Sequence, residues 1–327
     1  MKRIIIGIFV ILFAGLSAGL FTACASSAYP MPQEMHQHSL MIDGMERTFW
    51  VYDPGVQQNA PVIFMFHGGG GSALGILEDA QWNDLAQREN CIIVYPEGTR
   101  EHPDQLASFI GNPQNWNDGS PREDVIGAIR RNANDTAFFA AMTEYLKGNY
   151  PVDPGRIYAA GFSNGASMVF RLAYEFPDTL AAVAVVAGAD WRDPTQIYSA
   201  NRAVPLLYIT GDQDPLNPID GGKTYLGRLY VGTKLSVAQQ IEVWVQRHVQ
   251  LSGLLPDEYQ EENADGVIRR VYTNSQGISL IKYVIITRHG HHWPGGSRVL
   301  PARIAGPVAF SCKANEEIWS FFISHHL

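Results

Sequence analysis

One short stretch passes directly from an apolar run into a helical pattern, and it reads Tyr158-Ala-Ala-Gly-Phe-Ser-Asn-Gly165. Residues 156–160 predict a short buried strand, and residues 166–174 predict a helix. A strand that turns straight into a helix strains the backbone at the corner, and the two glycines let both elements pack closely around it. The hydroxyl of Ser163 is then held clear of the sheet, at the amino end of the helix.

The Ser163 hydroxyl can act as a nucleophile only if a base takes its proton and a third group orients that base. In this strand–turn–helix arrangement the acid and the histidine follow the serine in that order, each just after a strand. The alternative is a glycine-rich turn that carries a solvated serine. The strand and helix patterns favour the nucleophile, so an acid and a histidine are expected further along the chain.

The expected acid follows the strand predicted at 204–210, which leads into Gly211-Asp-Gln-Asp-Pro215. Two aspartates compete for the role. Asp214 is favoured because it lies deeper in the turn and precedes a proline, whereas Asp212 is expected to bond the turn backbone. The alternative for both is a solvated turn, where aspartate is common.

Three histidines follow the strand predicted at 279–286, in the run Thr287-Arg-His-Gly-His-His-Trp-Pro-Gly-Gly296. This position supplies the expected base, and the residues alone leave His289, His291 and His292 open. A His-x-His-His set can also indicate a metal site. No carboxylate or cysteine lies nearby and the Trp-Pro pair stiffens the loop, so we expect no metal ion here.

Four consecutive glycines follow the apolar run 61–66, which predicts a central parallel strand covered on both faces. Their backbone N–H groups are unobstructed by side chains, as an oxyanion hole requires. We expect the N–H of Gly69 or Gly70 to receive the oxyanion together with that of Asn164. The alternative, a flexible linker, is disfavoured because a buried strand leads directly into the loop.

The composition of the 327 residues, of which 46% are apolar, allows one large α/β domain or two small ones. A net charge of −8 argues against a nucleic-acid partner. Strand and helix patterns alternate along the chain, which predicts an α/β fold with a mostly parallel sheet and helices on both faces. A strand pair at 39–53 is expected to include an edge strand at 48–52. The sequence contains no long helical insertion of the kind that forms a large lid.

The amino terminus has the pattern of an export signal, because Lys2-Arg3 precedes an apolar run, 4–20, and small residues lead to Cys24. The expected organisation is a lipoprotein-type signal peptide at 1–23, a flexible tether at 24–38 and a catalytic domain at 39–327. The enzyme is then exported, and lipidation of Cys24 is its contact with the outer membrane or cell surface. Plain secretion, to the medium or the periplasm, and a retained membrane anchor are the alternatives.

Three tryptophans and one asparagine are candidates for contacting a substrate. Trp116 and Asn117 lie in a long irregular stretch, 99–124, and such loops tend to carry function. Trp116 could equally plug this loop onto the core. Trp191 follows a predicted buried strand, and Trp293 follows the three histidines.

Four blocks, within a match from about residue 40 to the end, look like the secreted polyhydroxybutyrate depolymerase and feruloyl esterase group of α/β-hydrolases. The blocks are His67-Gly-Gly-Gly-Gly-Ser72, Gly161-Phe-Ser-Asn-Gly-Ala166, Gly211-x-x-Asp-Pro215 and Gly290-His-x-Trp-Pro-Gly-Gly296. In the family's last block the histidine lies two residues before the tryptophan, and this selects His291. The resemblance implies an α/β-hydrolase fold and ester hydrolysis through an acyl-enzyme, without a cofactor.

These patterns together predict a serine carboxylic ester hydrolase in which Ser163 is the nucleophile, His291 the base and Asp214 the residue that orients it. The expected partner is an ester of plant polysaccharide, polyester or a small aromatic acid, and the protein is expected to be a monomer. Two alternatives stay open, a serine peptidase of the same fold and a non-catalytic surface lipoprotein that binds polysaccharide. The second is disfavoured because all three triad positions are filled.

Overall fold

The computed structural model describes residues 33–109, 111–122, 126–191 and 202–327. The expected signal peptide, the lipidation site at Cys24 and most of the tether lie outside the described residues. Within the described ranges, no helix combines the length and the apolar character that crossing a bilayer requires.

The regular elements of the described chain are as follows. The strands are β1 (Met35–Ile42), β2 (Met45–Tyr52), β3 (Ala60–Phe66), β4 (Ile92–Pro96), β5 (Val152–Phe162), β6 (Ala182–Val186), β7 (Leu206–Gly211), β8 (Gly222–Leu226), β9 (Leu229–Lys234), β10 (Leu254–Ala264), β11 (Val267–Asn274) and β12 (Ser279–Ile286). The helices are α1 (Ala73–Ala80), α2 (Trp82–Glu89), α3 (Gly127–Arg130), α4 (Asp135–Asn149), α5 (Asn164–Glu175), α6 (Val237–Ser252), α7 (Ala302–Ala305) and α8 (Ala314–Phe322).

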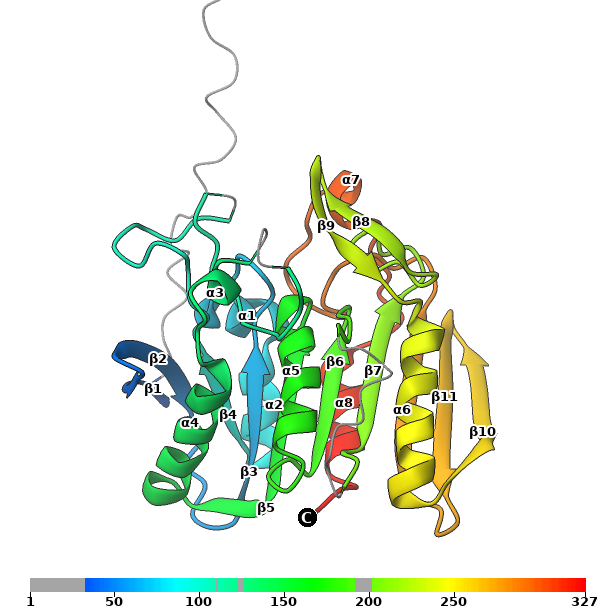
Figure 1. Ribbon diagram of the computed structural model, residues 1–327. Coiled ribbons are helices and arrows are strands. Elements are labelled where there is room, and N and C mark those ends of the chain that lie inside the picture. Colours follow the sequence, from blue (N-terminus) through cyan, green and yellow to red (C-terminus); the bar gives the residue numbers. More distant parts are fainter. Residues whose placement is uncertain (1–32, 110, 123–125, 192–201) are drawn as a thin grey trace, which may run out of the picture. The chain divides into compact units, whose positions relative to one another are not determined.

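Ten strands of the described chain form one sheet, in the order β1-β2-β4-β3-β5-β6-β7-β12-β11-β10 (Figure 1). The strands from β4 to β12 in that order run parallel, and antiparallel strands flank them on both sides. The predicted α/β fold with a mostly parallel sheet is therefore confirmed. The prediction of an edge strand at 48–52 is wrong, because β1 pairs with β2 and takes the edge position itself.

Strand β1 begins before the expected start of the domain at residue 39. Residues 35–38, which we expected to belong to the tether, pair with residues 49–52 of β2. The side chain of Met35 is buried in the core beneath this pair. Burial of one apolar side chain and a continuous ladder of backbone hydrogen bonds therefore extend the domain into the expected tether.

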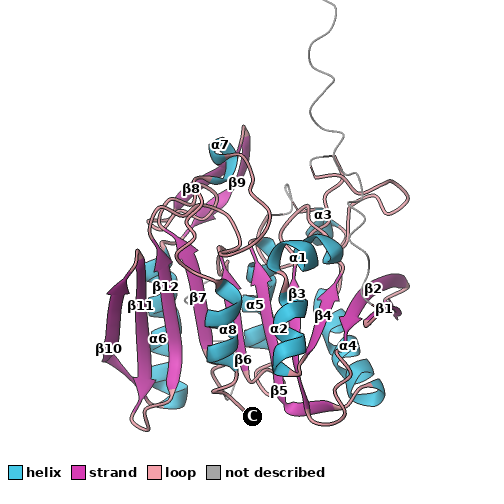
Figure 2. Cartoon of the chain, turned by 180° about the vertical axis from the view of Figure 1, so that it is seen from behind, coloured by secondary structure: helices cyan, strands magenta, loops and turns pink. Residues whose placement is uncertain are grey.

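Helices cover both faces of the sheet, with α4, α5 and α6 on one face and α1, α2 and α8 on the other (Figures 1 and 2). The core is split accordingly into two clusters. Along β3, the side chains of Val62, Phe64 and Phe66 belong to one cluster, and those of Ile63 and Met65 belong to the other. Successive side chains of a strand point to opposite faces, so a strand covered on both faces is apolar at every position.

A small hairpin of β8 and β9 lies beyond the carboxyl-terminal ends of the parallel strands, beside α7 in both views (Figures 1 and 2). Loops that leave these strand ends meet at the same edge, which is where ligands bind in open α/β sheets. The described residues add this hairpin and no lid domain to the edge. Residues 192–201, between β6 and β7, lie outside the description.

Candidate active site

Ser163 occupies the corner between β5 and α5, with φ of 54° and ψ of −118°. A positive φ is uncommon for a residue other than glycine and marks strain in the backbone. The flanking glycines allow the close approach that this corner needs. A Cβ on Gly161 would lie 2.4 Å from the carbonyl oxygen of Gly165, and a Cβ on Gly165 would lie 2.4 Å from that of Phe66. The strained turn predicted from the sequence is therefore present.

His291 lies between Ser163 and Asp214. Its Nε2 is 2.9 Å from Ser163 Oγ, and its Nδ1 is 2.8 Å from Asp214 Oδ2. The three residues follow β5, β7 and β12, so the ends of three parallel strands bring them together. The structure thus assembles the three residues singled out in the sequence, in the geometry of a nucleophile, a base and an orienting acid.

The carboxylate of Asp214 is buried, and both of its oxygens accept hydrogen bonds. Oδ1 accepts from the backbone N–H groups of Leu216 at 2.8 Å and Asn217 at 2.7 Å, while Oδ2 faces His291. Burial alone would raise the pKa of Asp214, but His291 and Lys234 outweigh this effect and lower it. Asp214 is therefore held as a carboxylate, which is the form that orients an imidazole.

The competing acid and histidines are engaged by the backbone. Asp212 accepts a hydrogen bond from the N–H of Arg288 at 2.6 Å. Nε2 of His289 lies 3.2 Å from the carbonyl oxygen of His292, and Nε2 of His292 lies 3.2 Å from that of Gly306. In the part of the chain that the structure describes, no group of three or more His, Cys, Asp or Glu residues could hold a metal ion.

The two candidate glycines of the oxyanion hole differ in what their N–H groups do. The N–H of Gly70 donates to the carbonyl oxygen of Gln114 at 2.7 Å, so the expectation that Gly70 is an oxyanion donor is wrong. The N–H groups of Gly69 and Asn164 have no acceptor among the described residues. Asn164 opens α5, and the first N–H groups of a helix lack partners within it. Gly69 and Asn164 are therefore the two donors that stay available.

Trp116 plugs the loop that follows β4 onto the core. Its side chain is fully buried, and its Nε1 donates to the carbonyl oxygen of His67 at 2.9 Å. Its backbone N–H donates to Oδ1 of Asn164 at 2.8 Å, and its carbonyl accepts from Nδ2 of the same residue at 3.3 Å. The expectation that Trp116 contacts substrate is wrong, because the whole ring is packed inside the protein.

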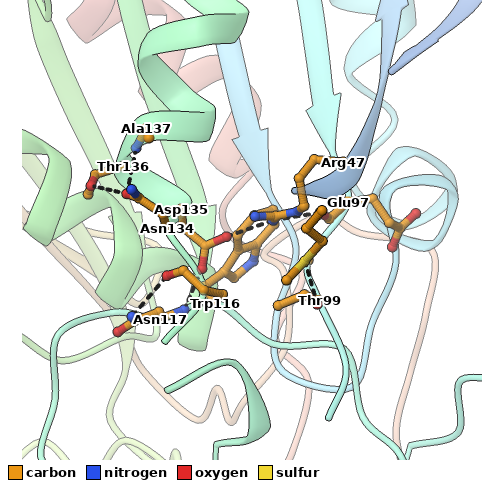
Figure 3. Close-up of polar contacts among 12 residues, drawn as sticks. Arg47, Glu97, Thr99, Trp116, Asn117, Asn134, Asp135, Thr136 and Ala137 are labelled. Carbon is orange, nitrogen blue, oxygen red and sulfur yellow. Dashed lines mark hydrogen bonds and ion pairs between the residues drawn. The ribbon is translucent and has the colours of Figure 1, made fainter. Parts of the chain in front are cut away.

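Asn117 is bound to the start of α4. Its backbone N–H donates to Oδ2 of Asp135 at 2.6 Å, and its Nδ2 donates to the carbonyl oxygen of Ala133 at 2.9 Å. Asp135 also forms an ion pair of 2.6 Å with Arg47 of β2, and both of these side chains are buried (Figure 3). Asn117 therefore anchors the loop, and its expected contact with substrate is not supported.

The two remaining candidate tryptophans differ in exposure. Trp293 is 3% exposed and its Nε1 donates to Oδ1 of Asn315 at 3.0 Å, so the expectation that it contacts substrate is wrong. Trp191 is half-buried, and its Nε1 donates to Oγ of Ser167 at 3.2 Å, one helical turn beyond Ser163. Trp191 is therefore the candidate that stays partly exposed, and it is hydrogen-bonded to α5.

His67 and Glu97 support the glycine loop from inside the protein. Nδ1 of His67 lies 2.8 Å from the carbonyl oxygen of the next residue, and its Nε2 accepts from the N–H of Gly98 at 2.9 Å. Burial lowers the pKa of His67 to about 4, so this histidine is neutral at pH 7. Burial likewise raises the pKa of Glu97 to about 7. The Glu97 carboxylate accepts from the N–H of Ala73 at 3.2 Å and from the side chain of Gln114.

Sequence reasoning missed Lys234 and the hairpin that carries it. Its Nζ donates to the carbonyl oxygen of Leu216 at 2.6 Å and to Oδ1 of Asn217 at 3.0 Å. A signal for the hairpin was present, because two runs with β propensity flank Gly227-Arg228. No feature of the sequence indicates that Lys234 reaches the acid turn, since that contact depends on how the hairpin packs.

The class of the protein follows from where the serine, the histidine and the acid meet. A serine on a strand–helix corner, at the carboxyl edge of a mostly parallel sheet, is the arrangement of the α/β-hydrolases. A model of the Phospholipase/Carboxylesterase family matches residues 47–230, and the chain belongs to this family.

Relatives of this chain carry the names of esterases and a depolymerase. It is 31% identical over 258 residues to NocK of Nocardia uniformis subsp. tsuyamanensis, which is named as an esterase, over 75% of this chain and 68% of that protein. It is 24% identical to poly(3-hydroxyalkanoate) depolymerase C of Paucimonas lemoignei, over 73% of this chain and 56% of that protein. Feruloyl esterase B of Thermothelomyces thermophilus is 30% identical over 42% of this chain and 43% of that protein.

Solved structures share the fold. An acetyl xylan esterase from Aspergillus awamori superimposes with a TM-score of 0.57 at 14% identity, over 88% of this chain and 99% of that one. The expected resemblance to the depolymerase and feruloyl esterase group is confirmed, and the chain is a carboxylic ester hydrolase.

Proposed function

We propose that this ester hydrolase works through an acyl-enzyme on Ser163, with His291 as general base and Asp214 as its orienting acid. The observation that carries the proposal is the pair of contacts made by one imidazole, 2.9 Å to Ser163 Oγ and 2.8 Å to Asp214 Oδ2. Nδ1 bears a proton when it faces a carboxylate, so Nε2 is free to accept the serine proton.

The reaction then has two halves. Ser163 Oγ attacks the ester carbonyl while His291 takes its proton, and the negative charge that develops on the carbonyl oxygen is received by the N–H groups of Gly69 and Asn164. The imidazolium returns the proton to the leaving alcohol, which departs and leaves the acyl group on Ser163. His291 next takes a proton from water, and the water oxygen attacks the acyl-enzyme. As the bond between the acyl carbon and Ser163 Oγ breaks to release the acid, the imidazolium returns the proton to Ser163.

The proposed substrates are apolar esters, joined to plant polysaccharide, within a polyester, or of small aromatic acids. The names of the relatives support this range, since they include a poly(3-hydroxyalkanoate) depolymerase and a feruloyl esterase. Large apolar side chains are also exposed on segments at the carboxyl edge of the sheet. They include Phe109, Tyr225, Tyr230 and Phe310.

We also propose that the enzyme is exported and acts as a monomer, tethered through a lipid on Cys24. The support is the charged start, apolar run and small residues that precede Cys24. Expression of the full chain and of Cys24→Ala in a bacterial host, followed by membrane fractionation, tests the tether. We expect the protein in the membrane fraction and the variant released from it. Equal distribution of the two would contradict lipidation.

The nucleophile is tested with Ser163→Ala, assayed on p-nitrophenyl acetate and labelled with a fluorophosphonate. We expect normal folding, loss of turnover by a factor of about 1,000 or more, and no covalent labelling. Ser320→Ala, an exposed serine on α8, is the matched control and should react as the wild type does. Labelling of Ser163→Ala at the wild-type rate would reject the proposal.

A hydrolysis panel then separates the substrate classes. It compares methyl ferulate, acetylated xylan, hydroxybutyrate oligomers and a peptide anilide at equal enzyme concentration. We expect the highest kcat/KM on one of the esters. A preference for the anilide would replace the esterase by a peptidase of the same fold, and no turnover of any ester would favour a non-catalytic binding protein.

A further inference from the structure

Lys234 is a cationic side chain that the proposed reaction does not use, yet it reaches the turn of the catalytic acid. We propose that Lys234 is a positioning residue, which couples the β8–β9 hairpin to Asp214 and holds its carboxylate in place for His291. This inference rests on the proposed function and deepens it, because it assigns a role to a residue outside the Ser–His–Asp group.

The contacts of Lys234 converge on the two residues that hold Asp214. Its Nζ donates to the carbonyl oxygen of Leu216 at 2.6 Å and to Oδ1 of Asn217 at 3.0 Å. The backbone N–H groups of these same two residues donate to Oδ1 of Asp214, at 2.8 and 2.7 Å. The lysine therefore binds the acid turn from the side opposite to the carboxylate.

One peptide unit carries the connection directly. The carbonyl of Leu216 and the N–H of Asn217 belong to the same planar peptide group. The carbonyl accepts from the ammonium of Lys234, and the N–H donates to Asp214. A cation on the carbonyl polarises the peptide group and strengthens the hydrogen bond that its N–H donates, because hydrogen bonds in series reinforce one another.

Oδ1 of Asp214 is thereby fixed, and Oδ2 is left to face His291. A carboxylate without these bonds could rotate about its terminal torsion, and the imidazole would lose the acceptor that sets its tautomer. Asn217 is itself anchored, since its Nδ2 donates to the hydroxyl of Tyr208 at 3.0 Å. The turn is therefore hydrogen-bonded to Asp214, to Tyr208 and to Lys234.

The surroundings of Lys234 are both charged and partly shielded from water. Among the described residues, Asp214, Asp118 and Arg122 are the charged groups that act on its ammonium. The ring of Trp191 lies 5.6 Å from Nζ and also faces the guanidinium of Arg122 at 4.0 Å. Burial lowers the pKa of Lys234 to about 7, against the attraction of the two carboxylates.

The experiment compares Lys234→Met, Lys234→Gln and the control Lys223→Met in the full chain, on p-nitrophenyl acetate from pH 5 to 9. Lys223 lies on the same hairpin, opposite Thr233, and is exposed. For Lys234→Met we expect kcat to fall by about 10-fold or more and KM to change by less than about threefold. Lys234→Gln keeps a donor for Leu216 but no charge, so it should show a smaller loss of kcat.

Circular dichroism and urea unfolding establish the folded fraction of each variant, and rates are referred to folded enzyme. If Lys234→Met does not fold, Lys234→Gln carries the test through the same comparison of kcat and KM. Folded variants with wild-type kcat would overturn the proposal. A rise in KM at constant kcat would also overturn it, because it would mean that Lys234 binds substrate. Failure of the proposed function itself gives a different result, namely turnover by Ser163→Ala.

Discussion

Asn164 and Trp116 are hydrogen-bonded to each other in both directions. The N–H of Trp116 donates to the side-chain oxygen of Asn164 at 2.8 Å, and the side-chain nitrogen of Asn164 donates to the carbonyl of Trp116 at 3.3 Å. The same nitrogen donates to Oδ2 of Asp118 at 2.9 Å. The first residue after the serine thus supplies a proposed oxyanion donor through its backbone and fastens the long loop through its side chain.

Substitution of Asn164 by alanine should impair turnover more than binding. The variant keeps its backbone N–H but loses three side-chain hydrogen bonds, and it leaves the buried N–H of Trp116 without its acceptor. We expect kcat to fall by about 10- to 100-fold with little change in KM, because the donor is no longer held in place. Steady-state kinetics on p-nitrophenyl acetate measure this, with the exposed Asn149→Ala as the control. A wild-type kcat would contradict the role.

The ion pair between Arg47 and Asp135 should matter for stability, because it is buried. Arg47→Met leaves the Asp135 carboxylate without its cation, and removal of one partner of a buried pair costs about 3–5 kcal/mol. The double variant with Asp135→Asn should recover part of this, since the side-chain oxygen can still accept from the N–H of Asn117. Urea unfolding measures both free energies. A single variant within about 1 kcal/mol of the wild type would show that the pair is dispensable.

Glu97 should make stability fall as the pH rises through neutrality. Its pKa is raised from 4.5 to about 7 in the folded protein, so the folded state binds more protons than the unfolded state between these values. The contribution of Glu97 is therefore complete below about pH 4.5 and is lost as the pH passes about 7, with an upper bound of about 3 kcal/mol. Glu97→Gln should flatten the dependence of Tm on pH between 5 and 8, and the exposed Glu144→Gln should not. Parallel curves for all three proteins would rule out this linkage.

The three neighbouring histidines should respond differently to alanine. His291→Ala should abolish turnover, because its imidazole is the one between Ser163 and Asp214. His289→Ala and His292→Ala should keep activity within about 10-fold and mainly lower Tm, because these rings bond backbone carbonyls. Kinetics and thermal unfolding of the three variants decide between them. An inactive but folded His292→Ala would show that His292, and not His291, is the base.

Ser163 and the candidate acid could be predicted because each depends on its local pattern, whereas His291 was selected among three histidines by the resemblance to the family. A glycine on either side of Ser163 is needed wherever a strand turns at once into a helix, and parallel strands all end at the same edge. An acid after β7 and a histidine after β12 were therefore expected to lie near the serine, although 128 positions separate His291 from Ser163. The choice of Asp214 over Asp212 also followed from local turn geometry.

The supporting residues could not be predicted, because their roles depend on which distant segments pack together. Trp116 and Trp293 have the residue type of a substrate contact, and only their burial shows that they belong to the interior. The N–H of Gly70 is equivalent to that of Gly69 in sequence, and the carbonyl of Gln114 distinguishes them.

The sequence by itself determined the parallel strands, the turn at Ser163 and the candidate acid, since short-range patterns specify strands, helices and turns. The resemblance to the family selected His291 as the candidate base. Only the tertiary structure decided how these groups are held, through contacts such as Lys234 to the turn of Asp214 and Asn164 to Trp116. The physical reason is that the energy of a hydrogen bond or of a buried charge depends on what excludes water around it, and that is a property of the packed chain.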